Sequence, residues 1–173
     1  MKLANINSQS AAAARPGYWN DPDMQVVGSQ GLTIDEQKIH FALWCIMSSP
    51  LFLGNDPRHM GTDEKAIILN RDCIRVDQDP TGQGKRVEQN GNSEVWAKKL
   101  KNGDMAVLLI NRSPVETADI SIDFQMLGIS GPLTISDIYG KKTLGTYTNQ
   151  FSYRIAPQSG LFLLCKKHDG VSK

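Results

Sequence analysis

Residues 15–24 read RPGYWNDPDM, and this composition is unusual for a connecting loop. The last six positions hold two acids, an amide, a large aromatic ring and a thioether. Two prolines and a glycine stiffen the backbone, and the apolar pair Val26-Val27 follows at once. A stiff segment of mixed chemistry beside a buried strand is typical of a pocket rim. Asp21 and Asp23 are two positions apart, so both side chains would point to one face of an extended backbone.

Turn formation is the alternative interpretation of the same residues. Asn20-Asp21-Pro22 is ordinary turn sequence, and aspartate also caps helices. From spacing alone, the turn interpretation is favoured over a binding site. The segment as a whole, together with the motifs that follow it along the chain, shifts the balance toward a site.

The block resembles the corresponding block of α-galactosidases, glycoside hydrolase family 27. The resemblance continues in order, and with similar spacing, over roughly residues 5 to 80. The further motifs are Ala42-Leu43-Trp44, Ser49-Pro50-Leu51-Phe52-Leu53-Gly54-Asn55-Asp56, Arg58-His59 and Asp77-Gln78-Asp79-Pro80. The rest of the chain, to about residue 168, resembles the C-terminal β domain of that family less specifically. A match of this length is far more specific than one short motif.

The resemblance implies a fold in two parts. Family 27 enzymes have a (β/α)8 barrel followed by an antiparallel β domain. We therefore expect α/β plus all-β structure, with the last two βα units of a TIM barrel in residues 1–79. An antiparallel β-sandwich is expected in residues 80–168, and a frayed tail in residues 169–173.

Periodicity independently predicts alternating helices and strands in the first part. Thr33 and Glu36 form a capping box, which predicts a buried helix to about residue 48. Residues 23–27 and 51–54 read as short, fully buried parallel strands. A helix is expected in residues 2–14, and another one is expected to be capped by Thr62.

Period-two patterns dominate after residue 84. Ile120, Ile122 and Phe124 alternate with polar residues, whereas residues 105–110 are apolar on both faces and should form a central strand. Further strands are expected at residues 133–138, 151–155 and 161–165. Hairpin turns are expected at Asn90-Gly91, Asn102-Gly103 and Tyr139-Gly140. Short strands at this spacing indicate a sandwich.

Composition excludes several other classes of protein. The 19 basic and 18 acidic residues nearly balance and form no basic run, which argues against nucleic acid or an anionic membrane as a partner. No apolar stretch is long enough to span a bilayer. Three widely spaced cysteines indicate buried free thiols rather than disulfides, and we assign no metal and no cofactor. The polar residues after Met1-Lys2-Leu3-Ala4 do not fit a signal peptide, so the compartment is not predicted. The family resemblance is compatible with a secreted or lysosomal parent enzyme.

The resemblance also implies a mechanism whose catalytic residues this chain does not supply. Retaining glycosidases use two carboxyl groups roughly 5–5.5 Å apart. In the family, the nucleophile follows barrel strand four and the acid/base follows strand six, whereas residues 15–24 belong to strand seven. We therefore expect both catalytic aspartates upstream of Met1, in a missing N-terminal barrel half, and we assign no catalytic residue here.

Four residues of the block are candidates for contact with the substrate. By resemblance, Asp23 lines the sugar pocket and Met24 packs beside it. Asp21 either contacts the sugar or braces the turn through backbone N–H groups. Trp19 either stacks on a sugar or, as we favour, packs as a buried aromatic. His59 is expected to pack in its loop, and Lys98-Lys99 to lie at a solvated strand end.

These observations predict the C-terminal part of an α-galactosidase acting on a terminal α-linked galactoside, and inactive alone. The alternatives are an α-N-acetylgalactosaminidase of the same family, a non-catalytic carbohydrate-associated β module, and a truncated product without independent function. The oligomeric state is not predicted.

Overall fold

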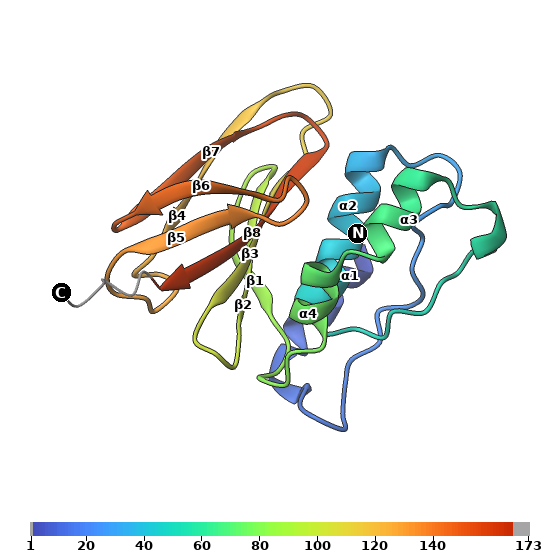
Figure 1. The fold of residues 1–173 in the computed structure, drawn as a ribbon, viewed down its shortest axis with the longest axis horizontal. Helices are drawn as coiled ribbons and strands as arrows, with labels where there is room; N and C mark the ends of the chain where they lie inside the picture. Colours follow the sequence, from blue (N-terminus) through green and yellow to red (C-terminus); the bar gives the residue numbers. More distant parts are fainter. Residues whose placement is uncertain (1, 168–173) are drawn as a thin grey trace.

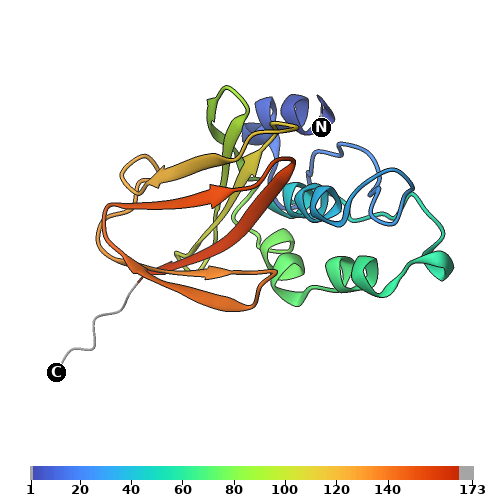
Figure 2. The same ribbon diagram turned by 90° about the horizontal axis from the view of Figure 1, so that it is seen from above.

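The computed structural model describes residues 2–167, in which a helical layer packs against an antiparallel β-sandwich (Figures 1 and 2). The expected tail at residues 169–173 lies outside the described residues. The helices are α1 (Lys2–Gln9), η1 (Ala11–Ala13), α2 (Ile34–Ile46), η2 (Pro57–His59), α3 (Thr62–Ile68) and α4 (Arg71–Asp77). The strands are β1 (Lys85–Asn90), β2 (Ser93–Lys99), β3 (Met105–Asn111), β4 (Ala118–Asp123), β5 (Leu133–Asp137), β6 (Lys142–Tyr147), β7 (Gln150–Ile155) and β8 (Ser159–Lys167). No helix among the described residues is long and apolar enough to cross a membrane.

The strands form two sheets. The larger sheet has six strands in the order β1-β2-β3-β8-β5-β6, and the smaller pairs β4 with β7. All named pairs are antiparallel, and tight connections join β1 to β2, β2 to β3 and β5 to β6 at the expected turns. The predicted sandwich is therefore confirmed, with β3 in the interior of the larger sheet as its two-sided apolar pattern predicts.

Each face of the larger sheet is buried in a different core. One face packs against α2, and the other packs against the β4–β7 sheet. Strand β3 divides its side chains between the two cores by simple alternation. Ala106, Leu108 and Ile110 face the helical layer, whereas Met105, Val107 and Leu109 face the second sheet. The helical layer and the sheet thus share a core, whereas the predicted boundary at residue 79 stays a prediction.

The two expected parallel strands are reduced to one parallel bridge between Gln25 and Leu53. The N–H of Gln25 donates to the carbonyl of Phe52 at 2.6 Å, and the N–H of Gly54 donates to the carbonyl of Gln25 at 2.8 Å. The expectation of a fully buried strand at residues 51–54 is wrong for this chain, because Phe52 is 68% exposed. Parallel strands are stable when neighbouring strands and helices cover both of their faces. The described residues cover only one face of these two segments.

The capping box at the start of α2 is confirmed. The Thr33 side chain accepts from the N–H of Glu36, and the Glu36 carboxylate accepts from the N–H of Thr33. The expected cap at Thr62 is wrong, because Thr62 is the first residue of α3 and Gly61 occupies the cap position. Helix α4 was not anticipated from the sequence, although Asn70 caps it by accepting from two backbone N–H groups.

Lys98 also departs from expectation, since it is 2% exposed rather than solvated. On β2 it lies two positions after Trp96, so alternation places it on the face toward the helices. Its ammonium donates to the hydroxyl of Ser48 and to the carbonyls of Val76, Asp77 and Asp79. Burial lowers the pKa of Lys98 to about 8. The buried cation thus satisfies carbonyls at the C-terminal end of α4.

The three cysteines are buried and free, as expected. Burial raises the pKa of the Cys73 and Cys165 thiols to about 12, so neither is a reactive thiolate at neutral pH.

Candidate sugar-binding site

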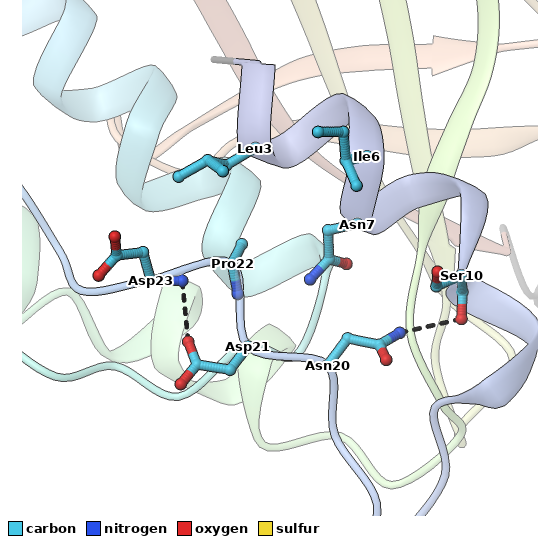
Figure 3. A pocket seen from close by; sticks show the side chains of 8 residues that line it. All are labelled: Leu3, Ile6, Asn7, Ser10, Asn20, Asp21, Pro22 and Asp23. Carbon is cyan, nitrogen blue, oxygen red and sulfur yellow. Dashed lines mark hydrogen bonds between the residues drawn. The ribbon is translucent and has the colours of Figure 1, made fainter.

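The segment that follows Trp19 lies between α1 and α2 and lines two neighbouring hollows. The first has a volume of about 480 Å³ and is lined by side chains of α1, by Ser10 just after it, and by residues 20–23 (Figure 3). The second has a volume of about 320 Å³ and lies against α2. Its lining residues are Leu3, Asp23, Met24, Val26, His40, Trp44 and Gly54. Asp23 and Leu3 line both hollows, so the two hollows adjoin at these residues.

The backbone of Asp23 is not extended, contrary to the geometry expected from spacing. Its φ is +93°, a conformation that residues other than glycine rarely adopt. Oδ1 of Asp21 accepts from the N–H of Asp23 at 2.9 Å, and Oδ1 of Asp23 accepts from the N–H of Met24 at 2.7 Å. The two carboxylates consequently point in different directions (Figure 3). Such a conformation persists where the surrounding contacts enforce it, and it is concentrated at functional sites.

Helix α2 supplies those contacts. The indole Nε1–H of Trp44 donates to the carbonyl oxygen of Asp23 at 2.8 Å. The N–H of Val26 donates to Nε2 of His40 at 3.1 Å. The two rings lie one turn apart on α2 with their centroids separated by 3.9 Å. Both are buried, so they form a fixed wall behind the Asp23 segment.

The electrostatics of His40 follow from this burial. Burial lowers its pKa from 6.5 to about 4. A ring nitrogen that accepts a hydrogen bond must be unprotonated, so the bond from Val26 also requires neutral imidazole. His40 is therefore an uncharged acceptor over the whole range from neutral to mildly acidic pH.

The structure brings together three of the four candidate residues. Asp21 and Asp23 line the first hollow, and Asp23 and Met24 line the second. Trp19 lines neither hollow, and it is 37% exposed rather than buried. Asp21 makes the backbone hydrogen bond that a turn brace requires.

Sequence reasoning missed His40 and Trp44 as part of the site. The His40 ring is buried and accepts a hydrogen bond from the backbone of the candidate loop. Their spacing of four residues on α2 was the available signal, since residues four apart share a helix face.

The hollows can accept a polar ligand. No hydrogen bond within residues 2–167 uses Oδ2 of Asp23, which leaves that oxygen for a ligand hydroxyl. Met24 is exposed beside it and offers an apolar surface. Across the described part of the chain, no group of three or more His, Cys, Asp or Glu side chains is arranged to hold a metal ion.

His59 lies outside this site. It is 82% exposed on η2, contrary to the expected packing role, and its Nδ1 is 3.3 Å from Oδ2 of Asp56. Asp56 also accepts from Arg58. The three side chains form a surface cluster rather than part of a pocket.

Two hollows lined in part by a carboxylate and a thioether lie beside a parallel backbone pairing, and an antiparallel sandwich follows them, so the fold is an α/β portion joined to a C-terminal β domain. Comparison with known proteins gives the family. Residues 2–79 match the family described as alpha galactosidase A, and residues 90–164 match the alpha galactosidase C-terminal beta sandwich domain. The chain belongs to the α-galactosidase family, glycoside hydrolase family 27, and corresponds to the C-terminal portion of its members.

Individual relatives agree with this assignment. The chain is 38% identical to the α-galactosidase of Oryza sativa over 157 residues, which are 89% of this chain and 37% of that protein. It is 33% identical to the α-N-acetylgalactosaminidase of Gallus gallus over 161 residues, 89% of this chain and 40% of that protein. The crystal structure of α-galactosidase I from Mortierella vinacea superimposes with a TM-score of 0.91 at 26% identity, covering 99% of this chain and 45% of that one. The chain thus spans less than half the length of these relatives.

Proposed function

We propose that residues 1–173 form the C-terminal part of a retaining α-galactosidase that removes terminal α-linked galactose from oligosaccharides or glycoconjugates. One observation carries the proposal. Asp21, Asp23 and Met24 line adjoining hollows within a chain whose two parts both match the α-galactosidase family. In the proposed site, Asp23 accepts sugar hydroxyl donors, Met24 packs against the sugar and Asp21 braces the loop.

We propose that neither Asp21 nor Asp23 belongs to the catalytic pair. Double displacement needs a nucleophile and a general acid/base, on carboxyl groups roughly 5–5.5 Å apart. The carboxylates of Asp21 and Asp23 are each bonded to a backbone N–H of the same loop. Because the family has its nucleophile after barrel strand four and its acid/base after strand six, we propose that the reacting carboxylates lie in a barrel part outside these residues and that residues 1–173 alone do not hydrolyse the substrate.

Exposed apolar side chains support the need for that further part. Large hydrophobic residues of α1 and of the parallel segments are open to solvent on the described chain: Leu3, Ile6, Met24, Val26 and Phe52. Parallel strands are buried on both faces in folded proteins, and an open edge invites aggregation. The proposed barrel remainder would cover Phe52 and enclose the hollows that the other four residues line, and we propose 1–79 as the barrel portion and 80–168 as the β domain.

An α-N-acetylgalactosaminidase is the second candidate. The Gallus gallus relative with that activity covers as much of the chain as the Oryza sativa α-galactosidase does. The hollows beside Asp23 do not distinguish a 2-hydroxyl from a 2-acetamido group, because no described residue is assigned to that position of the sugar.

The test compares the purified chain with a full-length enzyme that contains it. The full-length enzyme is expected to hydrolyse an aryl α-galactoside, and proton NMR is expected to show the α-anomer of galactose first, as retention requires. The chain alone is expected to release no aryl group and to bind a hydrophobic dye. Faster hydrolysis of the aryl α-N-acetylgalactosaminide would favour the second candidate. Turnover by a homogeneous, monomeric preparation of residues 1–173 would show that the catalytic pair lies within them.

A further inference from the structure

A stripe of three polar side chains runs along one face of α2, a helix that is otherwise mostly apolar and buried. Gln37, His40 and Trp44 occupy positions i, i+3 and i+7. Each makes a hydrogen bond to the backbone of the candidate loop segment. Gln37 Oε1 accepts from the N–H of Gly28 at 2.8 Å, whereas His40 binds Val26 and Trp44 binds Asp23. Three side chains of α2 thus fix the backbone of residues 23–28 against the helix at three points.

The hydrogen bonds on both sides of Asp23 determine the direction in which its carboxylate points. Trp44 holds the carbonyl of Asp23, and Asp21 holds its N–H, so both peptide groups that flank the positive φ are fixed. His40 then fixes the N–H of Val26, three residues along the chain. If the Trp44 bond is removed, the backbone can relax toward an ordinary φ, and the direction of the Asp23 side chain changes with it.

We propose that Trp44 and His40 are positioning residues of the sugar site, which hold the backbone of residues 23–26 so that the Asp23 carboxylate meets the ligand. The inference rests on the proposed function, in which Asp23 accepts sugar hydroxyls. Neither ring needs to touch the sugar. Their polar atoms act through the main chain, and the well-capped, buried α2 supplies the rigidity.

Gln37 provides a matched control from the same stripe. It is as buried as Trp44 and also binds the loop backbone, at Gly28. Gly28 lies five residues beyond Asp23, two residues farther along the chain than Val26, the partner of His40. Loss of the Gln37 contacts should therefore destabilise the fold without moving the Asp23 carboxylate.

The experiment uses the full-length enzyme, with an aryl α-galactoside as substrate and galactose as inhibitor. Trp44→Phe and His40→Leu are expected to raise KM and the galactose inhibition constant about 3- to 10-fold, the effect of one lost hydrogen bond. His40→Gln keeps an acceptor for Val26 and should restore both constants toward wild type. Gln37→Leu should lower Tm about as much as Trp44→Phe and His40→Leu do, but it should leave KM and the galactose inhibition constant within about 2-fold of wild type.

Asp23→Asn separates failure of this inference from failure of the proposed function. If Asp23→Asn weakens galactose binding but Trp44→Phe and His40→Leu behave like Gln37→Leu, the positioning role is wrong and the sugar site stands. If Asp23→Asn leaves galactose binding unchanged, the proposed site fails and the positioning role fails with it.

A measurement on the unsubstituted enzyme covers the case in which the Trp44 and His40 variants do not fold. Galactose should shift the indole N–H resonance of Trp44. The resonance of Trp96, whose indole donates to Glu94 in the sheet, should stay in place. A Trp44 signal that does not move at saturating galactose would contradict the inference.

Discussion

Asp21 and Asp23 are separated by one proline, and the structure gives their carboxylates different surroundings. Asp21 uses Oδ1 to hold the N–H of Asp23, whereas Asp23 keeps Oδ2 clear of hydrogen bonds within the described chain. Spacing suggested two equivalent side chains on one face. The positive φ of Asp23 removes that equivalence, and a backbone angle enforced by contacts from α2 cannot be seen in a local motif.

The first prediction follows from that difference. In the full-length enzyme, Asp23→Asn should lower kcat/KM by about one to two powers of ten, because a charge-assisted hydrogen bond contributes roughly 1.5–3 kcal/mol. Folding and covalent trapping of the glycosyl-enzyme should be retained. Asp21→Asn should lower Tm more than it lowers the activity of the folded fraction. Kinetics and thermal unfolding check both variants. If Asp23→Asn has wild-type kinetics, the assignment of Asp23 to the sugar pocket is wrong.

Two buried groups give this chain opposing responses to acid. Burial lowers the pKa of His40 from 6.5 to about 4, and it raises the pKa of Asp77 from 3.8 to about 7. Between pH 6.5 and 4, the unfolded chain binds a proton at His40 that the folded chain does not, so stability falls as pH falls. Between pH 7 and 3.8, the folded chain binds a proton at Asp77 that the unfolded chain releases, so stability rises as pH falls.

The second prediction is that substituting either residue alone makes the pH dependence of stability due to the other residue measurable. Each group accounts for a change on the order of 3 kcal/mol across its window, so the two largely offset each other. On acidification from pH 7 to 4, the unfolding free energy of Asp77→Asn should fall relative to that of wild type, because the stabilising protonation of Asp77 is lost. The unfolding free energy of His40→Gln should rise relative to that of wild type, because the destabilising protonation of His40 in the unfolded chain is lost. Urea unfolding at pH 7, 5.5 and 4 measures the effect. If both variants keep the wild-type pH profile, neither group is perturbed as the structure indicates.

Among the secondary-structure elements, α2 was the most predictable. Its capping box, its length and its buried second half could all be predicted, since a cap and a helical period are local signals. The short α4 was missed because seven residues give little periodicity and its cap, Asn70, is one residue. Residues 51–54 were misjudged because the burial of a parallel strand depends on neighbours that the segment does not encode.

The third prediction uses the two threonines that had both been expected to cap helices. Thr33 caps α2 through its side chain, whereas the cap of α3 is Gly61, with no side-chain hydrogen bond. Thr33→Ala should therefore cost about 1 kcal/mol of unfolding free energy. Thr62→Ala replaces a helical residue by a better helix former and should be neutral or slightly stabilising. Denaturant unfolding of both variants distinguishes them, and equal losses would contradict the assigned caps.

At the scale of the whole molecule, the order of the two parts and the sandwich class could be predicted, but their contact could not. Alternation along β3 shows that both faces are apolar, without showing that one faces helices and the other a second sheet. Buried Lys98 was misassigned for the same reason. Its partners are Ser48 and the carbonyls of Val76, Asp77 and Asp79, which the fold brings to β2 from nineteen or more residues away.

The last prediction concerns the independence of the β domain. The sheet face toward α2 buries large side chains, among them Trp96, Leu108, Ile110, Phe162 and Leu164. Exposing each costs roughly 1.5–3 kcal/mol, so the total approaches the whole stability of a domain. Residues 80–167 alone should therefore unfold at a lower temperature than residues 1–173 and bind a hydrophobic dye.

The junction itself supports the same expectation. The N–H of Gly84 donates to the carbonyl of Ile46 at the end of α2, and a Cβ at Gly84 would lie 2.6 Å from the carbonyl oxygen of Ala97. Pro80 and Thr81 are exposed, so protease is expected to cut there while the two pieces stay associated through the shared core. Size-exclusion chromatography of the nicked protein, followed by thermal unfolding of residues 80–167, measures the coupling. A monomeric, dye-free β domain with an unchanged unfolding temperature would show that the helical layer is dispensable for its stability, and that the domain boundary is also an energetic one.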